Sequence, residues 1–296
     1  MNPAAIARFF LPSPPMGGCI FAAVERDTRG ACLSDAQRFN YYPATPMFLI
    51  SWIFEGELHM VAEAGAESGR YRLDPALPRL VFSGPQRRPR ASWSPGAVHA
   101  LSVAFYPDAL AQLVGKPIEP FIDTILPASA VLGADLLAAC EALFERAAAP
   151  ALLNEIEGYF RPFWAGAHAR STAPLLGEWL RALATRAAFS KAGCGARQLQ
   201  RRIKSWAGQS YRDLQIFARV ETAFVHSGCS GSSAVDGLSA LALSAGFADQ
   251  SHMGREVRRV TGIPPGRFLQ LVATDEAFWF YRLIEGQFRT IDAHRQ

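Results

Sequence analysis

The segment 246–259 carries hydrogen-bonding side chains and arginines at helical spacing. A short apolar segment, 238–245, leads into its glycine turn, after which amide, hydroxyl, imidazole and guanidinium groups follow in sequence. Such groups hydrogen bond to the edges of nucleic-acid bases, and arginines also neutralise phosphates. A helix-turn-helix places them at the start of a second helix, which lies in the major groove of DNA. The pattern therefore predicts a DNA-reading helix whose contacting residues are Gln250, Ser251, His252, Arg255 and Arg258.

Asp249 stands directly before this predicted helix. A carboxylate repels phosphate, whereas at a helix start it accepts hydrogen bonds from backbone N–H groups that have no helical partner. We therefore expect Asp249 to cap its own helix rather than to read a cytosine.

A second copy of the pattern lies upstream, in segment 195–208. It is a basic helix that ends at a glycine, and Arg201 and Gly208 correspond to Arg255 and Gly262 at equal spacing. Each helix has apolar residues four positions apart, which predicts one buried stripe with arginines on another face. A long helix over 211–226 would hold the two units together, and reading helices about 34 Å apart enter successive major grooves. The residues of the first helix expected to contact DNA are Arg197, Gln198, Arg201, Arg202 and Lys204.

This pair of units resembles the DNA-binding region of AraC-type bacterial transcription regulators over residues 172–270. The stretches that carry the resemblance are Arg197-Gln198-Leu199-Gln200-Arg201-Arg202, Gly246-Phe247-x-Asp249-Gln250-Ser251-His252-x-x-Arg255 and Gly262-Ile263-Pro264-Pro265. The resemblance implies a double helix-turn-helix domain, with base-reading patches on the outer faces of both reading helices. The chain departs from the family at three places: Gly195 replaces the usual hydroxyl N-cap, Ala188-Phe189 the usual Leu-Ala pair, and Met253 the usual aromatic residue.

The first part of the chain has strand character instead. Alternating apolar segments at 47–54, 57–61, 79–82 and 97–105 are separated by turn residues, which predicts a small antiparallel sandwich or barrel. Tyr41-Tyr42-Pro43, the strand with Trp52, and segment 101–110 resemble the cupin-like sensor domain of one subgroup of these regulators. The whole chain is thus expected to be α+β. Its predicted parts are a β-rich sensor-like domain at 1–128, a helical connector at 129–171, a double helix-turn-helix domain at 172–272 and a helical tail at 273–296.

Aromatic residues of the β-rich part are candidates to line a ligand pocket, although core packing explains them equally well. These residues are Trp52, Phe54, Tyr71 and Phe105. His59 and His99 lack the His-x-His spacing of a metal site, so we expect ordinary barrel residues and neither a metal nor a cofactor. Cys194, just before the first reading helix, is a weak candidate for a redox or alkylation sensor. The aromatic cluster 278–281 is expected to pack onto the protein's own surface rather than to form a dimer contact.

Composition agrees with this division. Residues 171–296 carry 16 basic and 10 acidic side chains, whereas residues 1–170 carry 14 and 16, so the positive charge lies in the half with the reading helices. The five cysteines are scattered without a Cys-x-x-Cys, which favours a reduced, cytoplasmic setting. No apolar run approaches the ~18 residues of a membrane span.

The sequence thus predicts a transcription regulator that binds a specific site and is not an enzyme. Its N-terminal half is expected to sense a small molecule or to mediate dimerisation. The expected partners are double-stranded DNA, a small-molecule effector, RNA polymerase and a second copy of the chain, but no membrane. An alternative from another class is a cupin-like metalloenzyme or a DNA-repair alkyl acceptor carried on a DNA-binding module. A third keeps the regulator but gives its N-terminal half a protein partner.

Overall fold

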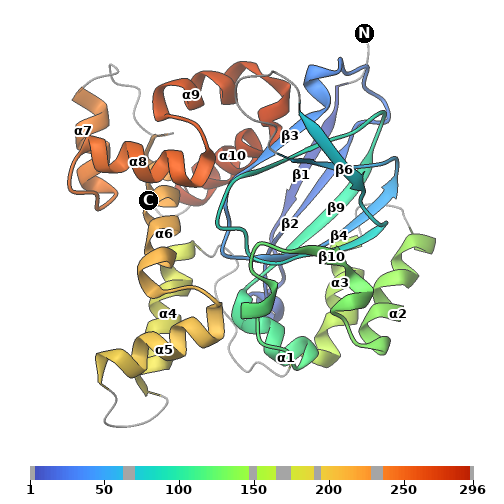
Figure 1. Ribbon diagram of the computed structural model, residues 1–296, viewed down its shortest axis with the longest axis horizontal. Coiled ribbons are helices and arrows are strands. Elements are labelled where there is room, and N and C mark those ends of the chain that lie inside the picture. The colour runs from blue at the N-terminus through green and yellow to red at the C-terminus, as the bar shows by residue number, and fades with distance from the viewer. Residues whose placement is uncertain are drawn as a thin grey trace.

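Two antiparallel sheets form the first part of the chain (Figure 1). The computed structural model describes residues 4–62, 71–146, 152–164, 175–189, 195–227 and 236–293. The larger sheet has the order β1 (Ile6–Phe10), β2 (Ile20–Asp27), β9 (His99–Phe105), β4 (Phe48–Glu55), β7 (Leu80–Ser83), β10 (Ile125–Pro127). The smaller has the order β3 (Phe39–Tyr42), β8 (Arg90–Trp93), β5 (His59–Ala62), β6 (Arg72–Ala76). This architecture, followed by helices, confirms the predicted α+β class.

Both faces of the larger sheet are covered by other parts of the protein. Successive side chains of a strand point to opposite faces of the sheet. On β4, Phe48, Ile50 and Trp52 pack into the main core. The alternate residues Leu49 and Ser51 face the other way, into an internal cavity described below. The core side is covered by a helical connector, α2 (Ala134–Ala142) and α3 (Leu152–Phe160), whose buried residues join the same cluster. A short helix, α1 (Leu110–Val114), closes one end of this core.

Within the described residues, six helices follow the connector and form the region expected to bind DNA. They are α4 (Leu176–Phe189), α5 (Ala196–Ala207), α6 (Tyr211–Ser227), α7 (Asp236–Ser244), α8 (Gln250–Thr261) and α9 (Pro265–Thr274). The long helix α6 packs against α4 and α5 of the first unit and against α7 and α8 of the second. It has 17 residues and is therefore about 25 Å long. Its contacts join the two units, as predicted. Most of the predicted linker 227–233 lies outside the described residues.

The last helix, α10 (Trp279–Ala293), packs against β1 and β3 of the N-terminal domain. The Trp279 Nε1–H group donates a hydrogen bond of 2.7 Å to the side-chain oxygen of Asn40. Phe278 stacks on Tyr41 with ring centroids 4.8 Å apart. These contacts confirm that the aromatic cluster 278–281 packs onto the protein's own surface. The tail is therefore a wall of the β-rich domain rather than a free appendage.

Candidate nucleic-acid interface and internal cavity

The N-terminus of α8 is fixed by Asp249, as the sequence predicts. Its carboxylate accepts a hydrogen bond of 2.6 Å from the His252 backbone N–H. The helix ends at Gly262, whose φ of 80° lies in the left-handed region that only glycine adopts easily. The turn before the helix contains Gly246, with φ of 78°. These local signals set both ends of α8 and its approach from α7.

The two faces of α8 have opposite character. Met253, Val257 and Val260 are buried against α6 and α7. Four of the five predicted contact residues are exposed on the helix: Gln250, Ser251, Arg255 and Arg258. An exposed face of amide, hydroxyl and guanidinium groups can hydrogen bond both to base edges and to phosphates.

His252, the fifth predicted contact residue of α8, is half-buried and its ring has local contacts. Its Nδ1 accepts a hydrogen bond of 3.3 Å from the Ala248 backbone N–H. The ring also meets Phe247 edge-on, with centroids 5.5 Å apart. This imidazole thus helps to close the turn before α8, a role that the sequence pattern did not reveal.

On α5, four of the five predicted contact residues are exposed: Arg197, Gln198, Arg201 and Lys204. The opposite face buries Ile203 and Ala207. The fifth, Arg202, is half-buried and donates a hydrogen bond of 2.9 Å to the Ala187 carbonyl at the end of α4. The structure therefore uses Arg202 to join the two helices of the first unit. Gly195 provides no side-chain cap, which agrees with the departure noted in the sequence.

A further arginine of α8 is tied to the scaffold. Arg259 Nη2 lies 3.0 Å from an Asp213 carboxylate oxygen near the start of α6. Partial burial acts to raise the pKa of Asp213, but hydrogen bonds from the Ser210 hydroxyl and from Arg259 outweigh it and lower that pKa. Both C-terminal arginines of α8 are exposed, but among the described residues only Arg259 forms an ion pair, which joins α8 to α6.

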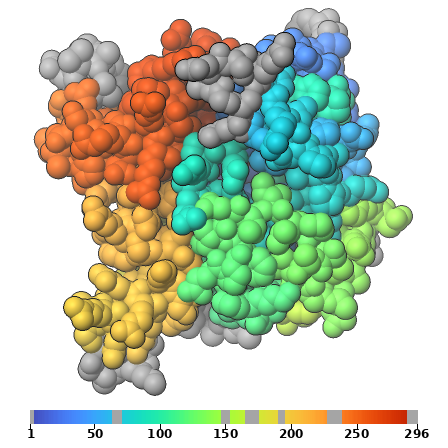
Figure 2. All heavy atoms as spheres, in the orientation of Figure 1, coloured from blue at the N-terminus to red at the C-terminus, as the bar shows by residue number. Residues whose placement is uncertain are grey.

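The N-terminal domain contacts both units at the ends of their reading helices. The Ala44 backbone N–H donates a hydrogen bond of 2.8 Å to the Val260 carbonyl in the last turn of α8. Gly208, the C-cap of α5, lies so close to Ile118 and Ile122 that a Cβ there would come within 2.8 Å of the Ile122 side chain. Figure 2 shows the two units along one flank of the molecule, beside the N-terminal domain.

Asp108 forms a second link between the N-terminal domain and the first unit. Its buried carboxylate accepts hydrogen bonds from Trp179 Nε1 at 3.0 Å and from Arg186 Nη2 at 2.7 Å, both on α4. The Arg186 guanidinium in turn lies over the Trp206 ring of α5, 4.5 Å from its centroid. A chain of contacts therefore runs from the N-terminal domain through α4 to the first reading helix.

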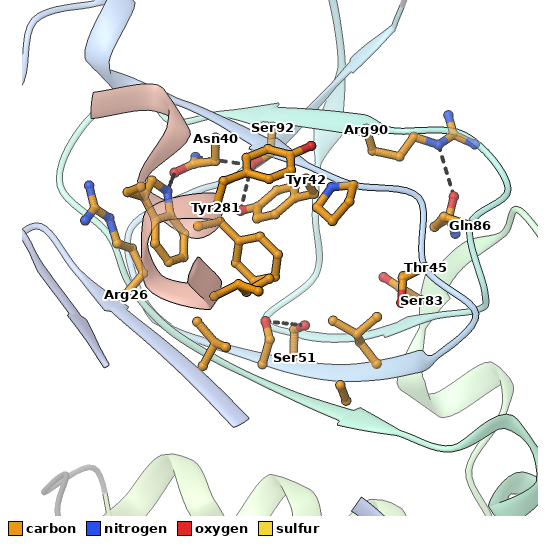
Figure 3. Close-up of a pocket in the computed structure, with 18 of the residues that line it drawn as sticks. Arg26, Asn40, Tyr42, Thr45, Ser51, Ser83, Gln86, Arg90, Ser92 and Tyr281 are labelled. Atoms are coloured by element: carbon orange, nitrogen blue, oxygen red, sulfur yellow. Dashed lines mark hydrogen bonds between the residues drawn. The ribbon is translucent and has the colours of Figure 1, made fainter. Parts of the chain in front are cut away.

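An internal cavity of about 320 Å³ lies where the two sheets meet the C-terminal helices (Figure 3). Its walls come from the inner face of the larger sheet, from β3 and β8 of the smaller sheet, and from α6, α9 and α10. Ser51 and Ser102, opposite each other on β4 and β9, join their hydroxyls at 2.8 Å. Because its walls include residues of the N-terminal domain and of the helix-turn-helix region, a molecule bound there would contact both.

The four aromatic residues predicted to line a pocket lie elsewhere. Trp52 and Phe105 are fully buried in the core on the opposite face of the larger sheet, where Trp52 donates to the Cys140 carbonyl. Phe54 packs against the same core, and Tyr71 is exposed with its ring edge against Phe39. Core packing therefore accounts for Trp52, Phe105 and Phe54. The residues next to them along the strands point to the opposite face of the sheet and line the cavity.

The two N-terminal histidines do not converge. His99 is buried and its Nε2 lies 3.0 Å from Glu25, whereas His59 bonds the Asp74 carbonyl at 3.0 Å. Within the described residues, no three His, Cys, Asp or Glu side chains gather as a metal site would require. Cys194 lies outside the described residues. None of the described helices is long and apolar enough to cross a bilayer.

Comparison with protein-family models decides the class of the C-terminal region. Residues 189–271 match a model described as a helix-turn-helix domain. This region is a helix-turn-helix domain. The match spans both α5 and α8 and agrees with the AraC-type resemblance of this part of the chain. Comparison with curated proteins gives no match.

Several solved structures are similar to the chain at low identity. ToxT from Vibrio cholerae is 10% identical with a TM-score of 0.39, over 91% of this chain and 99% of that one. A ToxT structure described as bound to an unsaturated fatty acid is 10% identical with a TM-score of 0.36, over 91% and 96%. The AraC-like transcriptional activator CuxR is 11% identical with a TM-score of 0.27, over 94% and 91%.

Proposed function

We propose that this protein regulates transcription by binding a specific duplex site through α5 and α8, under control of a small molecule held in the internal cavity. The observation that carries the DNA-binding part is the pair of exposed polar and basic faces within a helix-turn-helix domain. The proposed base readers are Gln250, Ser251 and Arg255 in the second unit, with Arg197, Gln198 and Arg201 in the first. Lys204 and Arg258 are proposed to contact phosphates.

His252 and Arg202 have a secondary part in this proposal. Each already has a contact within the protein, so each would position its helix and approach DNA only through its remaining nitrogens. A contact with RNA polymerase and a homodimer belong to the proposal as predictions from the resemblance.

The effector part rests on where the cavity lies. Residues of β2, β4 and β9 form one wall, while Phe217 and Val220 of α6 and Phe268 of α9 form another. A ligand that touches both walls changes the free energy of any rearrangement between them. It would thereby shift the population of DNA-binding-competent forms, as differential affinity for two states requires.

The test is selection of bound duplexes from a random pool with the full-length protein. Two short enriched blocks about one helical turn apart are expected if both units read bases. Arg255→Ala should erase preference within one block and Arg201→Ala within the other. Arg72→Ala, an exposed arginine on the small sheet, is the matched control and should leave both blocks unchanged. Absence of any enriched sequence would refute the proposal.

A further inference from the structure

The cavity wall is mostly apolar, and this limits what can occupy it. Small and branched side chains of the larger sheet face side chains of α6 and α10 across the space. The apolar lining includes Val24, Leu49, Ile53, Val81, Val220 and Ile284. Such a lining favours an apolar body, because transfer of apolar surface out of water is the main stabilising contribution to binding in a pocket of this kind.

Several polar side chains of the lining already form hydrogen bonds within the protein. Besides the paired hydroxyls of Ser51 and Ser102, the Asn40 amide donates to the Ser92 hydroxyl at 3.2 Å and accepts from Trp279. The Gln86 amide donates to the Gly84 carbonyl at 2.9 Å. These groups are satisfied without a ligand, so they leave few sites for a strongly polar molecule.

The charges of the lining are also largely compensated. Arg26 is buried, pairs with Glu276 at 2.5 Å and lies over the Trp279 ring. Arg38 pairs with Asp35 at 3.3 Å. The third lining arginine, Arg90, is exposed at the rim and directs its Nε to Gln86 (Figure 3).

The buried acidic group of the lining is also engaged within the protein. The Glu221 carboxylate lines the cavity from α6 and accepts a hydrogen bond of 2.6 Å from the Leu176 backbone N–H. A carboxylate placed inside this largely apolar lining would lose its own hydration. The interior is therefore suited to an uncharged molecule.

Among the described residues, two buried donor groups of the lining have no hydrogen-bond partner: the Arg26 Nε–H, on a side chain already paired with Glu276, and the uncharged Tyr281 hydroxyl. The Tyr281 hydroxyl on α10 is buried and has no hydrogen-bond partner among the described residues. It lies beside Tyr42 and Ser92 at one side of the cavity (Figure 3). Burial raises the pKa of Tyr281, so the hydroxyl stays protonated and acts as a donor. An unsatisfied buried donor costs free energy that an acceptor on a ligand would recover.

From this geometry we propose that the effector is an uncharged, largely apolar molecule with one hydrogen-bond acceptor, such as a carbonyl oxygen, that accepts a hydrogen bond from the Tyr281 hydroxyl. The inference rests on the proposed function, since it specifies the chemistry of the molecule in that same cavity. An amphiphilic anion held by Arg90 at the rim is the competing ligand class.

Titration calorimetry of the full-length protein with methyl nonanoate and decanoate tests the inference. The two probes have the same number of heavy atoms and differ chiefly in charge near neutral pH. The ester is expected to bind at least about tenfold more tightly, because the anion must bury its charge without a partner. Tyr281→Phe should weaken ester binding about five- to tenfold, the loss of one hydrogen bond. Tyr41→Phe is the matched control, because Tyr41 does not line the cavity.

The outcomes separate the inference from the proposed function. Decanoate binding as tightly as the ester, and weakened by Arg90→Gln, would overturn the uncharged-ligand inference and leave the effector site standing. Ester binding that Tyr281→Phe and Tyr41→Phe leave equally unchanged would overturn the role of Tyr281. If neither probe binds, both the inference and the effector part of the proposed function are overturned.

Discussion

Replacing Asp108 by asparagine should weaken the attachment of the first helix-turn-helix unit to the N-terminal domain. The Asp108 side chain is only 3% exposed and accepts hydrogen bonds from both Trp179 and Arg186 of α4. Asparagine has nearly the same shape but one acceptor oxygen. Its amide group must therefore face one of the two donors and leave that donor without a partner.

The expected loss of stability depends on whether each of the two donors can hydrogen bond to water after the substitution. The Trp179 ring is buried, so its N–H has no access to water. The Arg186 side chain is 40% exposed and can rehydrate, which reduces the cost of losing the ion pair. One lost hydrogen bond to a charged group then predicts a decrease of about 2 kcal/mol in the free energy of unfolding. Because Arg186 also lies over Trp206, the effect should spread to α5.

Urea denaturation followed by tryptophan fluorescence measures the first effect, and amide hydrogen exchange measures the second. Exchange should quicken in α4 and α5 more than in α8, which is anchored separately through Ala44 and Val260. Asp35→Asn is the control: that carboxylate is 76% exposed and should contribute below about 0.5 kcal/mol. Equal destabilisation by the two variants, or equal loss of protection in α5 and α8, would refute this reasoning.

Three further changes test other parts of the molecule. Arg255→Ala should cost about 1–3 kcal/mol on the selected duplex, measured by fluorescence anisotropy; equal weakening on unrelated duplexes would assign this arginine to the DNA backbone. Asp249→Ala should lower the free energy of unfolding by about 1 kcal/mol through loss of the helix cap, measured in urea, with Ser251→Ala as the near-neutral comparison; equal effects would contradict the cap. Burial raises the pKa of the Cys140 thiol to about 12, with a smaller contribution from Glu141. Iodoacetamide should therefore label exposed Cys32 and spare Cys140 in the folded protein, as peptide mass spectrometry would reveal; equal labelling would contradict the buried thiol.

The helix-turn-helix half could be read from the sequence because its signals are local. Asp249, Gly246 and Gly262 each act within a few residues of their own position, as cap, turn and helix end. The buried stripe of Met253 and Val257 follows directly from helical periodicity. Side chains pointing away from that stripe were therefore correctly expected at the surface, which is where Gln250 and Arg255 lie.

The cavity could not be assigned in the same way. On a strand that is buried on both faces, alternation separates two sets of residues without telling which set meets a core and which meets a cavity. Large aromatic side chains suggested the pocket, yet Trp52 fills the core beneath α2 and α3 while Ser51 faces the space. Tyr281 comes from a helix far along the chain, and only the docking of α10 brings it to the sheets.

Tertiary contacts also account for the residues whose roles differ from the sequence pattern. Arg202 and Arg201 are adjacent and chemically identical, but only Arg202 is turned toward the end of α4. His252 follows Ser251 in the predicted reading set, yet Phe247 and the Ala248 backbone N–H use its ring. A helical wheel gives the direction of a side chain, whereas the neighbouring helix decides whether that side chain remains available.

The cavity and the helix-turn-helix region share side chains of α6, which couples binding in the cavity to the packing of α8. Phe217 and Val220 of α6 line the cavity and also belong to the hydrophobic cluster that buries Met253 and Val257 of α8. A ligand that moves the cavity face of α6 must therefore alter the packing beneath the second reading helix. Since coupling between two sites is reciprocal, the proposed function requires that DNA change the affinity of the cavity ligand by the same factor by which that ligand changes DNA affinity. The second unit, with its cap fixed by Asp249 and its core joined to the cavity, is the part through which this coupling should act.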